Sequence, residues 1–80
     1  MYMTALKSFR GNNQTLNIYE NTVELVNPRY NATVTRWSIE VVQKTGMGQL
    51  QINAGGMELT YRGNDSDSAY EAVLEMLNKQ

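Results

Sequence analysis

The sequence has no cysteine and no histidine among its 80 residues. Without cysteine the chain can form neither a disulfide nor a thiolate metal site, so its core must stabilise the fold alone or with help from self-association. Without histidine it has no imidazole to bind a metal, to act as a general base or to switch charge near neutral pH. These two absences argue against the commonest catalytic and metal-binding sites.

The chain also has no marked excess of one charge sign and no long apolar run. Seven basic and eight acidic residues give a net charge of −1, and neither sign forms a run. The balance argues against a nucleic-acid-binding protein, which normally has a basic excess, and against a polybasic membrane patch. No segment reads as a signal peptide or a transmembrane helix. We therefore expect a cytoplasmic protein with no membrane span and no nucleic-acid partner.

The length fits one domain spanning residues 1–80, because a chain of this size can build only one thin core. Neither a repeat nor a linker interrupts the chain. We expect strands within residues 2–62 and a C-terminal helix at about 66–79.

The first strong structural signal is a β-hairpin at residues 15–26. A two-residue loop at Glu20-Asn21 lets polar and apolar side chains alternate on both strands. Position 18 then pairs with 23 and position 16 with 25, as a half-buried sheet requires. The apolar face carries Leu16, Ile18, Val23 and Leu25.

A second and stronger hairpin turns at Gly55-Gly56, a pair that suits the tight turns matching the twist of β-strands. This loop pairs position 54 with 57, 52 with 59 and 50 with 61. All the apolar residues then share one face, namely Leu50, Ile52, Ala54, Met57, Leu59 and Tyr61. A slip of one residue would turn the whole set outward, so the register is well specified.

Three further segments contain good strand-forming residues, at 2–9, 32–37 and 38–44. Glycine and asparagine residues after position 10 and glycines after position 45 mark turns that separate strands. In the segment 38–44 the alternation breaks between Val41 and Val42, which predicts a β-bulge or a corner.

The tail has the period of a helix. Its apolar face carries Tyr70, Val73, Leu74 and Leu77, widened by Ala69 and Met76. Ser68 and Glu71 fit a capping box. Asp65 and Asp67 place negative charge near the helix start, where it is favourable. The pattern predicts an amphipathic helix that begins between 66 and 69 and covers the apolar faces of the hairpins.

Six or seven short antiparallel strands followed by one helix resemble a pleckstrin-homology-type barrel, and the chain is similar to short bacterial PH-like domains of unknown function. The likeness lies in Phe9-Arg10-Gly11, in the hairpin at 16–25, in residues 37–42 and in the Gly-Gly hairpin before the helix. It implies an α+β, mainly β fold in which six or seven antiparallel strands form a sheet or roll. It also implies a binding scaffold, although fold alone does not fix function.

The chemistry available to the chain is limited. With no histidine, acid–base catalysis would fall to carboxylates, lysines or tyrosines. The eight carboxylates are scattered, and each has a structural reason for its place. Asn64, Asp65 and Asp67 crowd oxygen atoms together, but a calcium-binding loop needs a glycine and a distal glutamate that are missing, so helix capping explains the cluster. We expect no enzyme activity, no catalytic residue, no metal and no cofactor.

The resemblance directs attention to one group of basic residues. Lys7 and Arg10 flank Gly11-Asn12-Asn13, and PH domains that bind phosphoinositides use basic residues around the first hairpin loop. Two charges are few for recognition of a phosphate head group. A simpler interpretation is that these two basic side chains are solvated at the end of a strand.

Arginine beside an aromatic residue gives the other binding candidates. Trp37 follows Arg36, and Tyr30 follows Arg29 in a proline-containing loop. Trp, Tyr and Arg dominate interaction hot spots. A lone tryptophan in a thin core is more often its anchor, whereas Tyr30 has the better claim to exposure. The candidate binding residues are Arg10, Arg29, Tyr30, Arg36 and Trp37.

Strand edges offer a second mode of interaction. The stretch from Ala32 to Val42 contains few charged residues, and a strand edge without charge can pair with another strand. Such an edge could join copies into a homo-oligomer or take up an extended segment of another protein, while a closed edge is an equal alternative.

We therefore expect a non-catalytic protein-interaction or regulatory module, such as a small bacterial or phage protein that binds and modulates a larger protein. Two alternatives stay open at this point. One is a PH-like domain that binds a lipid or phosphate ligand, and the other is a structural subunit that acts as a homo-oligomer.

Overall fold

The computed structural model describes residues 5–46 and 48–78. In these ranges seven β-strands precede one α-helix. The strands are β1 (Lys7–Arg10), β2 (Thr15–Ile18), β3 (Thr22–Val26), β4 (Asn31–Thr35), β5 (Ile39–Thr45), β6 (Gln49–Ala54) and β7 (Met57–Arg62); a 3₁₀ turn (Arg36–Ser38) follows β4, and the helix is α1 (Ser66–Asn78). No helix in the described ranges is long and apolar enough to cross a membrane.

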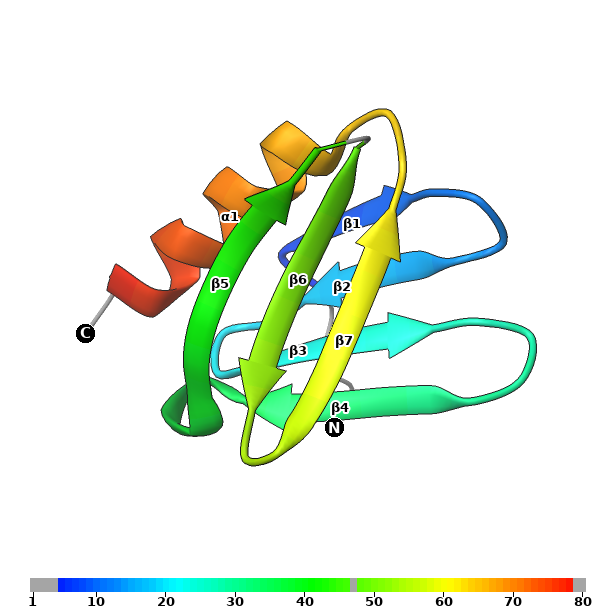
Figure 1. The fold of residues 1–80 in the computed structure, drawn as a ribbon. Coiled ribbons are helices and arrows are strands. Elements are labelled where there is room, and N and C mark those ends of the chain that lie inside the picture. The colour runs from blue at the N-terminus through cyan, green and yellow to red at the C-terminus, as the bar shows by residue number, and fades with distance from the viewer. Residues whose placement is uncertain (1–4, 47, 79–80) are drawn as a thin grey trace.

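The strands divide into two antiparallel sheets whose strand directions cross in Figure 1. One sheet has the order β1-β2-β3-β4 and the other the order β5-β6-β7. The helix lies beside β5 and also contacts β6 and β2, so it touches both sheets. The mainly β fold with a C-terminal helix is therefore confirmed, and its seven strands are split four and three between the sheets.

Both predicted hairpins have the predicted registers. In the first, Ile18 pairs with Val23 and Leu16 pairs with Leu25. In the second, positions 54, 52 and 50 pair with 57, 59 and 61. The whole apolar face of the first hairpin is buried, and so is that of the second except for Met57 beside the turn.

The remaining strands differ from prediction at their ends. The segment 2–9 contributes β1, which begins only at Lys7 and continues to Arg10, while residues 1–4 lie outside the described ranges. The segment 32–37 stops being a strand at Thr35, because the 3₁₀ turn redirects the chain from one sheet to the other. An irregularity is present, but it lies before the predicted position of 41–42, as a register shift between Ile39 and Val41.

The helix begins at Ser66, so Ser68 lies inside its first turn and the predicted capping box is wrong. The main-chain N–H of Ala69 donates to the carbonyl of Asp65 at 2.9 Å, which is the bonding pattern of the first helical turn. Asp65 therefore precedes the helix, and its carboxylate accepts the hydroxyl of Tyr61 at 2.7 Å. The predicted helix end at 79 lies outside the described residues.

The core fills the space between the two sheets and beneath α1. Tyr61, 1% exposed, has the largest of its fully buried side chains, and its hydroxyl has the polar partner that a buried tyrosine requires. Trp37 is 75% exposed, so the expectation that it anchors the core is wrong. It sits on the 3₁₀ turn after β4, and alternation continued from the buried Ala32 and Val34 would itself place position 37 on the outer face. The buried hydrophobic residues are Leu16, Ile18, Val23, Leu25, Ala32, Val34, Leu50, Ile52, Ala54, Leu59, Tyr61, Ala69, Ala72, Val73 and Met76.

The loop after β1 joins the two sheets at the end of β7. Gly11 lies against the carbonyl group of Arg62 with no room for a Cβ atom. The main-chain N–H of Asn12 donates to the same carbonyl at 3.1 Å. The side chain of Gln14 donates to the carbonyl of Thr60 and accepts the N–H of Arg62, each at 3.0 Å. Gln14 thereby covers the outer edge of β7.

Candidate binding groove

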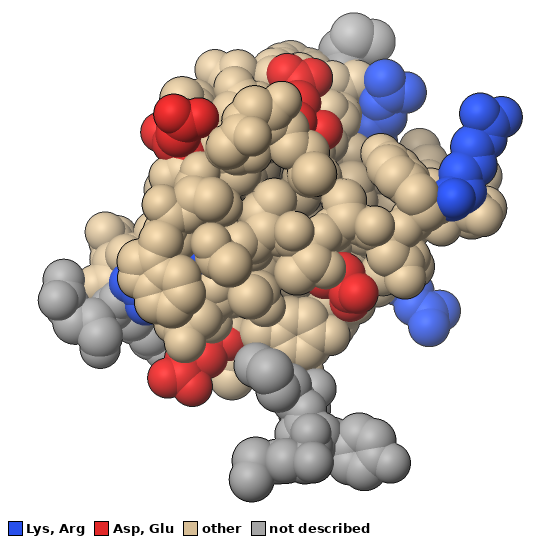
Figure 2. Space-filling view, turned by 90° about the horizontal axis from the view of Figure 1, so that it is seen from below, with Lys and Arg blue, Asp and Glu red and all other residues tan. Residues whose placement is uncertain are grey.

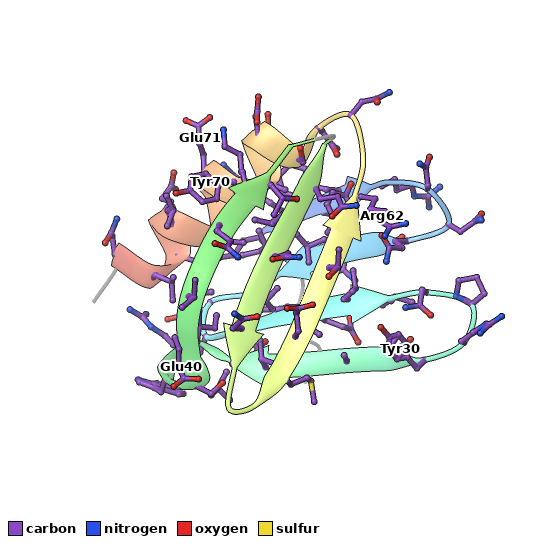
Figure 3. All side chains as sticks on the ribbon, in the orientation of Figure 1. Tyr30, Glu40, Arg62, Tyr70 and Glu71 are labelled. Carbon is purple, nitrogen blue, oxygen red and sulfur yellow. The ribbon has the colours of Figure 1, made fainter. Side chains whose placement is uncertain are left out.

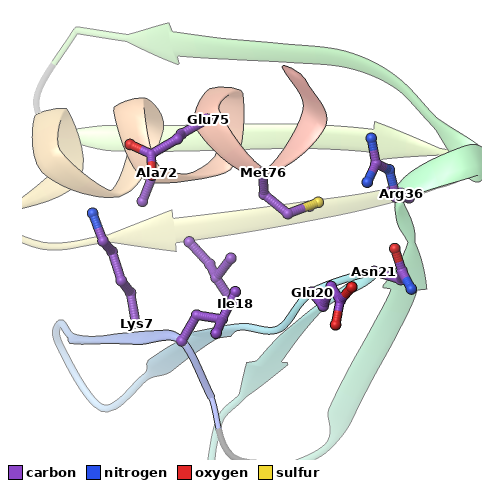
Figure 4. A pocket seen from close by; sticks show the side chains of 9 residues that line it. Lys7, Ile18, Glu20, Asn21, Arg36, Ala72, Glu75 and Met76 are labelled. Atoms are coloured by element: carbon purple, nitrogen blue, oxygen red, sulfur yellow. The ribbon is translucent and has the colours of Figure 1, made fainter. Parts of the chain in front are cut away.

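A groove lies between α1 and the adjoining side of the four-stranded sheet (Figure 4). Its volume is about 370 Å³, within the range of small ligand-binding sites. Four segments of the chain line it, contributing Leu6, Lys7, Ile18, Glu20, Asn21, Arg36, Ala72, Glu75 and Met76. We call this feature the helix groove.

The floor of the helix groove is apolar. Ile18 ends β2, while Ala72 and Met76 lie on one face of α1 because residues four apart are neighbours on a helix. All three side chains are buried. Leu6, just before β1, is 60% exposed and adds an apolar surface that water reaches. The accessible apolar surface of the groove therefore comes mainly from Leu6.

Charged side chains of both signs surround this floor. Lys7 and Arg36 come from opposite ends of the groove in Figure 4, while Glu75 comes from the helix and Glu20 from the turn between β2 and β3. Lys7, Glu20 and Glu75 are exposed. Because both signs are present, the groove suits a ligand that carries an apolar group flanked by opposite charges.

Two polar contacts hold the helix beside the groove. Nη2 of Arg36 donates to the main-chain carbonyl of Leu77 at 3.1 Å, in the last turn of α1 as described. Near the start of α1, Nζ of Lys44 lies 2.9 Å from Oδ1 of Asp67 and 5.3 Å from the centre of the Tyr70 ring. The hydrogen bond to Asp67, together with its charge, raises the pKa of Lys44. Both ends of the helix are thus tied to the strand layers.

A second hollow adjoins the helix groove, since Asn21 and Arg36 line both. It has a volume of about 490 Å³, and Trp37 and Leu77 complete its lining. We call it the Trp37 hollow. A tryptophan this exposed offers the large, rigid contact surface on which binding hot spots are built.

The structure groups the candidate residues differently from the sequence. Arg36 and Trp37 lie together on the 3₁₀ turn at the groove end of β4. Arg29 and Tyr30 lie in the turn before β4, where both main-chain N–H groups donate to Oδ1 of Asn27 at 3.0 and 3.1 Å. Figure 3 shows Tyr30 at the end of the sheet away from the 3₁₀ turn. Tyr30 is 52% exposed, as predicted.

The two basic residues near the first loop do not work as a pair. Lys7 lines the helix groove, whereas Arg10 stands at the other end of β1. Positions three apart in a strand face opposite sides of a sheet. The basic residue that lies beside this loop is instead Arg62 of β7, whose main-chain carbonyl accepts the N–H of Asn12. Sequence reasoning missed Arg62 because it is far away along the chain.

The acidic residues at the helix start have protein partners. Oδ1 of Asp65 accepts the Tyr61 hydroxyl, and Oδ1 of Asp67 pairs with Lys44. Within the ranges 5–46 and 48–78, no three His, Cys, Asp or Glu side chains gather to hold a metal ion. The local role of these carboxylates is to bind β5 and β7 to the helix start.

Sequence reasoning also missed most of the helix groove. One signal was available, because Ala72, Glu75 and Met76 have the spacing of a single helix face. The other wall comes from Leu6 and Ile18, and periodicity within one segment does not reveal which distant segment it will meet.

The comparison with known proteins adds one finding to this geometry. No protein-family model, no curated protein and no solved structure matches the chain. Its function must therefore be argued from its own residues.

Proposed function

We propose that this chain is a non-catalytic protein-interaction module that binds a segment of a larger protein in the helix groove. One observation carries the proposal. A buried apolar floor of Ile18, Ala72 and Met76 opens beside the exposed Leu6 and is bounded by charges of both signs. An apolar centre with a polar rim is the arrangement in which interaction hot spots occur.

The lining of the groove defines the segment that it would accept. An aliphatic side chain of the partner would cover the exposed Leu6. A neighbouring acidic residue would meet Lys7, and a basic residue would meet Glu20 or Glu75. The apolar contact would supply most of the affinity, while the exposed charges would set the orientation and the association rate.

The same charges favour binding over catalysis. Lys7, Glu20 and Glu75 are exposed to water at the rim, whereas a general acid or base normally works in a site that excludes water. The role that suits exposed charges is complementarity with a partner surface.

We also propose that the scaffold is PH-like and that the protein regulates the larger one it binds. Four antiparallel strands, then three, then a C-terminal helix follow the order expected of such a barrel, which supports the assignment. The scaffold itself carries no function, so the regulatory role rests on the groove.

Capture of a partner by matched variants tests this function. Tagged wild-type protein and the variants Leu6→Asp and Met57→Asp are incubated with nuclease-treated lysate of the source organism. Leu6 and Met57 are both exposed apolar residues, but only Leu6 lines the groove.

We expect one stoichiometric partner on wild-type protein and on Met57→Asp, reduced at least about tenfold on Leu6→Asp, because a buried charge without a partner is costly at an interface. Equal capture by both variants, or an eluate that contains only the bait, would contradict the proposal.

A further inference from the structure

The four-stranded sheet ends at β4, whose only hydrogen-bonded strand neighbour among the described residues is β3. Two bonds fix the alternation of this ladder. At one end the N–H of Arg36 donates to the carbonyl of Asn21 at 2.8 Å, and at the other the N–H of Asn27 donates to the carbonyl of Tyr30 at 3.0 Å. In an antiparallel ladder, hydrogen-bonded pairs alternate with non-bonded pairs.

It follows that Ala32 and Val34 exchange hydrogen bonds with β3. The main-chain N–H and C=O groups of the other three residues of β4 point away from β3, and these residues are Asn31, Thr33 and Thr35. The carbonyl of Thr35 accepts the hydroxyl of Ser38 at 2.8 Å, which still leaves one lone pair for another donor. The outer edge of β4 is thus a row of main-chain groups without a strand partner in the described chain.

The other sheet edges are protected, and β4 is not. The edge of β7 is bonded by the Gln14 side chain at Thr60 and Arg62, and β5 lies beside α1. The edge strand β1 has Lys7 and Arg10 at its two ends. Proteins usually prevent edge-to-edge pairing with a charged residue, a proline or a bulge in the edge strand. In contrast to the other edges, β4 contains none of these.

We propose that β4 pairs with β4 of a second copy of this chain, antiparallel and centred on Thr33. This register places Thr33 opposite Thr33, and Asn31 opposite Thr35 at both ends. It uses every outward-pointing residue, and each of the resulting pairs exchanges two main-chain hydrogen bonds. The two four-stranded sheets become one continuous sheet.

The side chains support a second copy as the occupant. The paired positions are all polar and uncharged, so no like charges oppose each other, and threonine pairs are favourable across strands. The register keeps these pairings within Asn31–Thr35, where the backbone is that of a strand.

The surface on this side of the molecule agrees with that arrangement. Figure 2 views the molecule from below, the side on which β4 lies in Figure 1. Uncharged residues fill most of the middle of this face, acidic side chains are scattered over it, and basic side chains lie toward its outline (Figure 2). Two copies can approach here without bringing large patches of one charge together.

Cysteine cross-linking tests the register, because the chain has no cysteine of its own. Directly opposed residues in a bonded antiparallel pair have Cα atoms about 5.5 Å apart, within the range that a disulfide spans. We expect Thr33→Cys to form a cross-linked dimer at least about tenfold faster than Ser8→Cys, which places a thiol on the exposed edge strand β1. Equal rates, or faster cross-linking of Ser8→Cys, would overturn the proposal.

Sedimentation velocity over a range of concentrations supplies a second test that needs no cross-link. We expect wild-type protein and Thr33→Val to dimerise alike, because valine keeps both the main-chain groups and the branched shape. Thr33→Lys sets two like charges face to face and should weaken dimerisation at least about tenfold. A wild-type protein that stays monomeric at millimolar concentration would exclude the second copy. If that monomer bound an extended segment of another protein at β4, the edge would belong to that protein instead.

No residue of β4 lines the helix groove, so this inference and the proposed function can fail separately. Leu6→Asp should lose the partner and keep the dimer. Thr33→Lys should lose the dimer and keep the partner.

Discussion

Replacing Gly11 with alanine tests the joint between the two sheets. The added Cβ would lie 2.9 Å from the carbonyl carbon of Arg62 and 3.1 Å from the ring of Tyr61, and nearer still to the carbonyl oxygen. One neighbour is main chain of β7 and the other is a core side chain, so neither can give way easily. The loop after β1 must therefore move away from β7.

That movement would break or stretch three hydrogen bonds. The main-chain bond from Asn12 to Arg62 is 3.1 Å long, and the two bonds between Gln14 and β7 are each 3.0 Å. A typical hydrogen bond contributes about 1 kcal/mol net, so their full loss would cost about 3 kcal/mol. We expect Gly11→Ala to lower the free energy of unfolding by about 2–3 kcal/mol, which for a domain of this size lowers Tm by roughly 10–20 °C.

Urea and thermal unfolding followed by far-ultraviolet circular dichroism measure this loss. Gly46→Ala is the matched control, because a Cβ at that position would meet nothing within 4 Å. We expect the control to lie within about 0.5 kcal/mol of wild type. The reasoning is refuted if Gly11→Ala is as stable as wild type, or if Gly46→Ala loses as much stability.

Two further predictions concern the aromatic residues. Burial and the hydrogen bond to Asp65 raise the pKa of Tyr61 above its ordinary value of 10.0, so the folded protein keeps a proton that the unfolded chain releases. Stability is therefore complete below pH 10 and falls as the pH rises further. Tyr61→Phe should cost about 1–2 kcal/mol at pH 7, and this deficit should shrink in urea titrations toward pH 11; a constant deficit would contradict the argument. Trp37→Ala should change the free energy of unfolding of dilute protein by less than about 0.5 kcal/mol, whereas truncating a buried tryptophan costs about 3–5 kcal/mol. A loss above about 2 kcal/mol would indicate that Trp37 is buried in the core, and would contradict this prediction.

The hairpins are predictable from sequence because their registers depend on local chemistry. The pair Gly55-Gly56 fixes a tight turn, and strict alternation from Leu50 to Tyr61 leaves one register that buries the apolar set. The helix is predictable for the same reason, since its period is read within one segment. Its start at Ser66 lies within the predicted range, but the contact of the Asp65 carboxylate with the buried Tyr61 hydroxyl does not follow from sequence, because it depends on the packing of β7.

The site depends on contacts between distant segments. Trp37 belongs to a stretch with strand-like composition, and alternation from the buried Ala32 and Val34 points position 37 outward, but nothing local predicts the 3₁₀ turn on which it lies. The helix groove needs Leu6 and Ile18 on one wall and Met76 on the other, which only the tertiary fold brings together. The open edge of β4 is partly predictable, because the strand contains no charge. The hydrogen bonds by which Gln14 protects the edge of β7 are not predictable from sequence.

The most direct test of the helix groove as a binding site is photo-crosslinking in cells of the source organism. A benzophenone side chain is placed at Leu6, or at Met57 as the matched exposed position outside the groove. We expect one discrete crosslinked product with another protein from position 6 and none from position 57. A probe at position 6 that captures nothing, or the same product from both positions, would contradict it.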